Sequence, residues 1–165
     1  MTIRFRSAHA VPVLAALALL ALTPAAEAKE IHLHFGLSGK AETPPNDSKG
    51  KGHGDVTYDD QTMEMKWKIS WKGLSGDATA AHFHGPAKPG ASAGPVVAIK
   101  AADGITSPLI GSATLTDDQA KQLLAGDWYW NIHTKQFPNG ELRGQVVKSD
   151  MVMPKAKPGA ASSAK

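Results

Sequence analysis

Residues 63–72 alternate between apolar and polar side chains, and this pattern restricts the possible folds more than any other feature. The apolar set consists of Met63, Met65, Trp67, Ile69 and Trp71. The polar set consists of Glu64, Lys66, Lys68, Ser70 and Lys72. Successive side chains of a β-strand point to opposite faces, so this segment is expected to bury one face and expose the other. Half-buried strands of this kind are typical of antiparallel sheets, and we expect an all-β domain.

Other strand-like runs, separated by loops rich in Gly, Pro, Asn and Asp, predict further strands. They cover residues 30–39, 52–60, 80–84, 94–100, 110–116 and 128–134, and a last strand follows the turn at residues 138–140. One short helix is predicted over residues 116–126, where Thr116 and Gln119 match a capping box and Gly126 can end the helix. About eight antiparallel strands with one helix predict a β-sandwich or a flattened barrel.

The two ends of the chain differ from this pattern. Arg4 and Arg6 precede an apolar run at residues 11–22, and small residues follow up to Ala28. This order is typical of a signal peptide cleaved after Ala28, so we expect residues 1–28 to be removed and the protein to be periplasmic or secreted. An uncleaved anchor is the weaker alternative, because the apolar run is about a dozen residues and a membrane span needs roughly 20.

Residues 151–165 consist largely of Pro, Gly, Ala, Ser and Lys and are predicted to form a disordered tail. A single domain is therefore expected over residues 29–150, with no membrane span after cleavage of the signal peptide.

Composition excludes several classes of function. The chain contains no cysteine, which rules out thiol catalysis, thiolate metal sites and CxxC redox chemistry. Its formal net charge is only +3, and part of the excess lies in the C-terminal segment. This charge pattern does not indicate a nucleic-acid partner.

Histidines on the polar faces of the predicted strands are the strongest candidates for chemistry. Alternation places His82 and His84 on the face opposite Ala81 and Phe83, where both imidazoles can reach one ion. His133 is likewise expected on the polar face of residues 128–134, opposite the apolar side chains of that strand. Three histidines with an open fourth position are typical of reactive metal sites, and neutral imidazole suits copper or zinc.

The hairpin that carries His133 adds further candidates. A turn centred on Asn139 places His133 opposite Gln145, with Arg143 and Glu141 on the same polar face. Such a Glu-x-Arg pair on an exposed hairpin is usually a cross-strand ion pair.

An exposed polar strand face explains a His-x-His pair equally well, because short motifs often match by chance. His32 and His34 repeat the spacing, and for them the polar edge is the favoured interpretation. His53 is a candidate fourth ligand in a Gly- and Lys-rich segment, where a surface histidine is the favoured alternative.

Three blocks of the sequence resemble the CHRD family, whose domain was first described in chordin. They lie at residues 37–59, 81–97 and 115–146 and include AHFHGPA, NIHT and FPNGELRGQV. The resemblance extends over residues 31–147. It implies an extracytoplasmic antiparallel β-sandwich, immunoglobulin-like in outline, and for bacterial members a small exported protein.

A second resemblance is to the copper,zinc superoxide dismutases, which are Greek-key β-sandwiches. Their copper is held by a His-x-His strand and a later histidine, and an arginine guides the anion. His82, His84, His133 and Arg143 occur here in that order, which implies a copper site with Arg143 as an anion guide. The chain lacks the disulfide pair, the zinc loop and the electrostatic loop, which puts dismutase activity in doubt.

Two hypotheses follow from these observations. In the favoured one, the protein is an exported metal-binding protein that holds copper, or alternatively zinc. In the other, it is an extracytoplasmic module that binds a protein or a polysaccharide without metal or catalysis.

Overall fold

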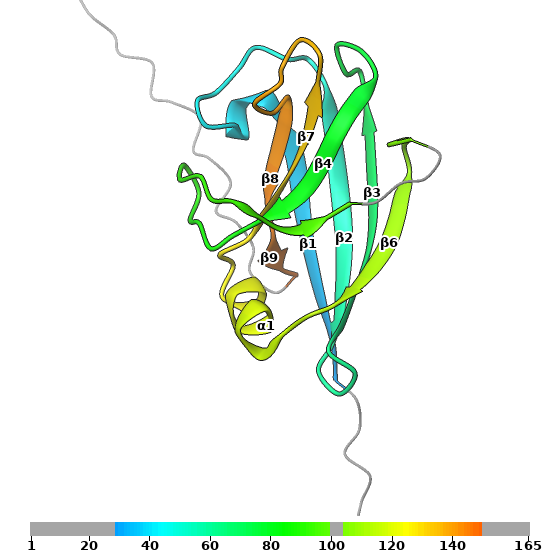
Figure 1. Cartoon of the computed structure of the whole chain (residues 1–165), viewed down its shortest axis with the longest axis vertical. Helices are drawn as coiled ribbons and strands as arrows, with labels where there is room; N and C mark the ends of the chain where they lie inside the picture. The colour runs from blue at the N-terminus through cyan, green and yellow to red at the C-terminus, as the bar shows by residue number, and fades with distance from the viewer. Residues whose placement is uncertain (1–28, 100–103, 150–165) are drawn as a thin grey trace, which may run out of the picture.

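The computed structural model describes residues 29–99 and 104–149, which fold into antiparallel strands and one helix (Figure 1). The strands are β1 (Glu30–Ser38), β2 (Lys51–Asp59), β3 (Glu64–Lys72), β4 (Ala78–His84), β5 (Pro95–Ala98), β6 (Leu109–Thr114), β7 (Tyr129–Thr134), β8 (Leu142–Gln145) and β9 (Val147–Lys148). The helix α1 spans Asp117–Leu124, and a short 3₁₀ turn spans Gly39–Ala41. The predicted signal peptide at residues 1–28 and the predicted tail at residues 151–165 lie outside the described residues.

The strands form two layers that meet at one corner. Hydrogen bonding joins them in the order β5-β4-β7-β8-β1-β2-β3-β6, and β9 also pairs with β1. In Figure 1, β4, β7 and β8 lie in front of β1, β2 and β3, and the layers meet where β8 pairs with β1. After β4, β5 and β6 the chain passes through α1 and returns as β7 beside β4, which is a Greek-key order. The predicted all-β Greek-key sandwich with one short helix is confirmed.

Aromatic side chains from both layers fill the space between them. The ring of Phe35 on β1 lies 6.1 Å from the ring of Trp130 on β7, measured between centroids. Trp67 on β3 lies 5.3 Å from Phe83 on β4. The alternation of residues 63–72 is borne out, since Met65, Trp67 and Ile69 of that segment are buried. The period-two pattern therefore identified the buried face of β3 correctly.

The helix begins and ends as its sequence predicts. Gln119 donates its backbone N–H to Thr116 Oγ1 at 3.3 Å, and Thr116 donates its backbone N–H to Gln119 Oε1 at 2.9 Å. Gly126 follows the helix with a φ of 72°, a left-handed conformation that glycine adopts without strain. Leu123 is fully buried and packs α1 against the end of the sandwich.

The predicted register of the β7–β8 hairpin is wrong. His133 does not face Gln145; instead, Tyr129 pairs with Gln145 and Asn131 pairs with Arg143. The cause is the geometry of the loop, because the Phe137 carbonyl accepts N–H bonds from Thr134 and Gly140. The loop is therefore centred on Phe137 and not on Asn139.

The expected exposed ion pair between Glu141 and Arg143 is not formed. Both side chains are buried, with exposed fractions of 0% and 2%. The Glu141 carboxylate accepts hydrogen bonds from Ser48, Ser75 and Thr134. It therefore links the segments around residues 48 and 75 to the β7–β8 hairpin.

The helix of the described residues is neither long nor apolar enough to cross a membrane.

Candidate metal centre

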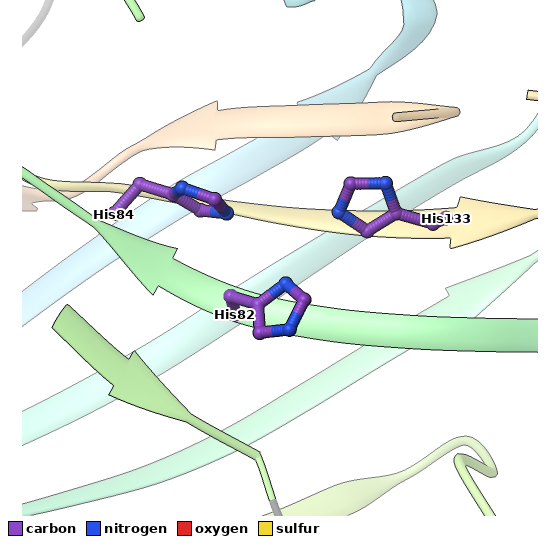
Figure 2. Close-up of side chains that lie close together, drawn as sticks. All are labelled: His82, His84 and His133. Carbon is purple, nitrogen blue, oxygen red and sulfur yellow. The ribbon is translucent and has the colours of Figure 1, made fainter. Parts of the chain in front are cut away.

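The three predicted metal ligands lie on two neighbouring strands of one layer. His82 and His84 belong to β4 and point away from the buried Phe83, and His133 belongs to β7. His82 is the cross-strand neighbour of Asn131, and His84 and His133 lie on opposite sides of that pair. Figure 2 shows the rings of His84 and His133 extending toward each other, with the ring of His82 beside the gap.

The three imidazoles converge on one point. Each offers a nitrogen such that all three atoms lie within 4.8 Å of one another. The ring centroid of His82 is 5.4 Å from that of His84 and 5.5 Å from that of His133. Metal bonds of about 2.0–2.1 Å require nitrogens roughly 3.3 Å apart in a tetrahedral site. Small side-chain rotations are therefore enough to bring the three nitrogens around one ion.

Backbone carbonyls orient two of the rings. His84 Nδ1 lies 2.9 Å from the Ala93 carbonyl oxygen, and His133 Nδ1 lies 2.9 Å from the Pro138 carbonyl oxygen. A carbonyl can only accept, so each Nδ1 carries the proton and donates it. In a neutral ring, Nε2 then holds the free electron pair, which is the usual arrangement of a metal-binding histidine.

Two nitrogens of the cluster are buried without a partner. Among the described residues, none forms a hydrogen bond with His82 Nδ1 or His84 Nε2. Leaving a buried polar atom unpaired typically costs about 1–3 kcal/mol. These atoms are therefore available to an ion, and an ion would remove that cost.

Burial favours the neutral form of two imidazoles in the cluster, those of His82 and His84. Burial lowers the pKa of His82, and the neighbouring His84 and His133 lower it further. Burial is also the main cause of the lowered pKa of His84, and the hydrogen bond to Ala93 partly opposes it. Because neutral imidazole is the form that binds a metal, the fold holds both side chains in the ligating state.

Asn131 is a member of this site that the sequence reasoning missed. Its Oδ1 lies 3.1 Å from His133 Nε2, and its side chain is 3% exposed. The alternation of residues 128–134 places it on the same face as His133. Its place beside His82 depends on the pairing of β4 with β7, which the alternation does not give.

Arg143, the predicted anion guide, is buried and reaches the cluster through Tyr129. Tyr129 stacks on His84 with ring centroids 4.8 Å apart, and the Arg143 guanidinium lies 3.5 Å from the centroid of the Tyr129 ring. Arg143 donates to the Ala91 carbonyl at 2.7 Å and to Thr43 Oγ1 at 3.2 Å. These contacts hold the guanidinium in the interior, where it supports the Tyr129–His84 stack.

The other candidate histidines lie elsewhere. His53 is exposed on β2, and the structure does not bring it to the cluster. His32 and His34 lie on β1, and they belong to no group of metal-ligating side chains among the described residues. The structure thus assembles three of the four proposed ligands, His82, His84 and His133.

Comparison with known proteins gives the family. The sequence matches the CHRD domain over residues 33–146. The chain belongs to the CHRD family. All members of the histidine cluster, and Asn131, lie inside the matched span, so the site is part of the CHRD domain of this chain. A search of curated proteins and a search of solved structures found no match.

Proposed function

We propose that this CHRD protein is an exported metal-binding protein whose site consists of His82, His84 and His133. The observation that carries the proposal is the pair of buried nitrogens, His82 Nδ1 and His84 Nε2, that have no hydrogen-bond partner among the described residues. They belong to two of the three imidazoles of the cluster, each of which offers one nitrogen within 4.8 Å of those of the others. A cation is the ligand that this arrangement of electron pairs best accommodates.

A purely structural role explains the cluster less well. Structural histidines usually pair both nitrogens with protein groups or water. Here the loop carbonyl of Ala93 holds only one nitrogen of His84, and His84 Nε2 and His82 Nδ1 are buried with no hydrogen-bond partner among the described residues. His82 and His133 are partly exposed, so an ion can reach the site from solvent.

Copper is the favoured metal, and zinc is the alternative. Imidazole ligands suit both ions, and divalent copper binds a given nitrogen site more tightly than zinc. The chain has no cysteine to compete for either ion. The signal-like pattern of residues 1–28 supports export, which would expose the site to periplasmic or extracellular metal.

Titration of residues 29–165 with copper(II) and zinc(II) tests the proposal. We expect binding of one ion per chain, which His82→Ala and His133→Ala abolish. His53→Ala and His32→Ala are matched controls, because they remove an exposed histidine outside the cluster and should leave binding unchanged. Weak binding that is the same in the wild type and in all four variants would refute the metal site. It would favour the alternative, a metal-free module that binds a protein or a polysaccharide.

Superoxide turnover is a separate question and is not part of the proposal. It becomes worth measuring on the copper-loaded protein once the stoichiometry is established.

A further inference from the structure

Asn131 suggests which ions the site selects, and the inference rests on the metal site proposed above. We infer that Asn131 Oδ1 is the fourth ligand, and that the site consequently takes a divalent ion, Cu²⁺ or Zn²⁺, in preference to Cu⁺. Three lines of geometry support this assignment: the position of Asn131 in the sheet, its contact with His133, and the direction in which its amide is turned.

The sheet places Asn131 at the centre of the cluster. It lies on β7 directly across from His82 on β4, and His84 and His133 lie on opposite sides of this pair. Asn131 and the histidines all point to the outer face of this layer, because Phe83, Trp130 and Ile132 between them are buried in the core. Asn131 therefore lies on the same face of the sheet as the three histidines, across from His82 and two residues from His133.

The contact between Asn131 and His133 brings two acceptors together. His133 Nδ1 carries the proton that it donates to Pro138, so a neutral His133 presents an electron pair at Nε2. Asn131 Oδ1 lies 3.1 Å from that nitrogen and also presents electron pairs. Two acceptors at this distance repel each other unless a proton or a metal ion lies between them, and a metal ion can serve both electron pairs at once. The separation is close to the roughly 3.3 Å expected between two ligand atoms on one tetrahedral ion.

Glu42 explains why the amide oxygen faces the histidines. Gly140 lies next to both side chains. A Cβ placed on it would lie 2.9 Å from Asn131 Nδ2 and would collide with Glu42 Oε1, so the amide nitrogen and the carboxyl lie on the same side of Asn131. The carboxyl attracts the NH₂ end of the amide, and the oxygen end is consequently turned toward the cluster. Glu42 therefore acts as a positioning residue for Asn131.

The donor set determines the preferred ion. An amide oxygen is a hard ligand that suits divalent ions, whereas Cu⁺ prefers soft sulfur ligands or a small number of nitrogens. Met63 and Met65 pack against or within the core, on the other layer, and are not part of the outward-facing cluster. Three imidazoles and one amide oxygen form a site that holds Cu²⁺ or Zn²⁺ through four protein atoms.

The inference is tested by comparing the affinities of the wild type and of Asn131→Ala for Zn²⁺, Cu²⁺ and Cu⁺. Each affinity is measured by competition with a chelator, and ascorbate keeps Cu⁺ reduced. We expect Zn²⁺ and Cu²⁺ to bind at least about tenfold more weakly, and Cu⁺ to change by less than about threefold. Asn131→Asp keeps an oxygen and adds charge, so it should bind both divalent ions at least as tightly as the wild type. Asn139→Ala, in the exposed loop, is the matched control.

The outcomes separate this inference from the proposed function. If the wild-type protein binds no metal, the proposed function fails. If the wild type binds and His82→Ala abolishes binding, but Asn131→Ala binds Zn²⁺ as tightly as the wild type, only the role of Asn131 is overturned. If Asn131→Ala weakens the binding of all three ions equally, the role of Asn131 as a ligand is also overturned, because the residue would then act only by maintaining the fold.

A measurement on the wild type covers the case in which Asn131→Ala fails to fold. Addition of Zn²⁺ should shift the assigned side-chain ¹⁵NH₂ signal of Asn131 while that of Asn46, which donates to the backbone of Gly140 and Glu141, stays in place. An Asn131 signal that does not move when the histidine ring signals do would refute direct ligation.

Discussion

Replacement of Glu141 by glutamine should destabilise the fold strongly, although the side chain lies outside the proposed metal site. Glu141 Oε1 accepts the backbone N–H of Ser75 and the hydroxyl of Ser48, each at 2.8 Å. Glu141 Oε2 accepts the hydroxyls of Ser75 and Thr134, each at 2.6 Å. These are four bonds to one fully buried carboxylate.

The magnitude follows from these four bonds. Hydrogen bonds to a charged group contribute about 1.5–3 kcal/mol each, compared with about 1 kcal/mol between neutral groups. Glutamine keeps the shape and can still pair with rotated hydroxyls, so most of the loss is the difference between charged and neutral bonds. We expect Glu141→Gln to lower the free energy of unfolding by about 2–4 kcal/mol. Glu141→Ala leaves the donors unpaired and should cost more.

Urea denaturation at pH 7, followed by tryptophan fluorescence, measures this change. Glu64→Gln is the control, because Glu64 pairs with Lys66 at the surface at 3.2 Å and such pairs contribute less than about 1 kcal/mol. The hydrogen bonds from Ser75, Thr134 and Ser48 hold the pKa of Glu141 below its usual value although burial, the largest single effect, acts to raise it. The stability from Glu141 should therefore be present above the unfolded pKa and lost as the pH falls through the folded pKa. A loss below about 0.5 kcal/mol in Glu141→Gln at pH 7 would refute the reasoning.

Three further predictions concern the cluster and its surroundings. Zinc at a hundred times its dissociation constant should stabilise the protein by about 2.7 kcal/mol in thermal unfolding, and His84→Ala should remove this effect; equal stabilisation of both proteins would contradict the site. Gly140→Ala should destabilise the fold in urea by about 2 kcal/mol or more and weaken zinc binding, because Gly140 has a φ of 131° and its Cβ would collide with Glu42. Gly90→Ala is the control, since Gly90 has a φ of 84° but open space around it, and an equal loss in both variants would leave only backbone strain as the cause. Burial raises the pKa of Glu42 to about 7, although the positive charge of Arg143 acts in the opposite direction. The contribution of Glu42 to the free energy of unfolding should therefore be largest below pH 4.5 and should be lost as the pH rises through 7, where the buried carboxyl loses its proton. Glu42→Gln should therefore be more stable than the wild type at pH 8, by up to about 3 kcal/mol, and no gain in chemical denaturation at that pH would count against the raised pKa.

The sequence predicted most of the fold because alternation and turn residues act locally. The buried faces of β3 and β4 follow directly from the parity of residues 63–72 and of Ala81 and Phe83. The cap of α1 depends only on Thr116, Gln119 and Gly126, which are near each other in the chain. Local patterns of this kind can be recognised without knowing which strands are neighbours.

The candidate site was predicted only in part because it depends on strand register. The parity of β4 and β7 placed His82, His84 and His133 on outward faces but could not show that the two strands pair. The hairpin loop around Phe137 shifted β8 relative to β7, and the expected neighbour of His133 was consequently wrong. The burial of Arg143 also depends on loops far away in the sequence, which the local pattern does not describe.

Loop carbonyls, and not strand groups, hold two of the three imidazoles. The oxygen that orients His84 belongs to Ala93 and the one that orients His133 belongs to Pro138, and both residues lie outside the strands. Loops accept substitutions and changes of length more readily than the strands they connect. The affinity of the proposed metal site can therefore be adjusted, over the course of evolution or by an engineer, through residues 85–94 and 135–140, while the three histidines and the sandwich stay the same.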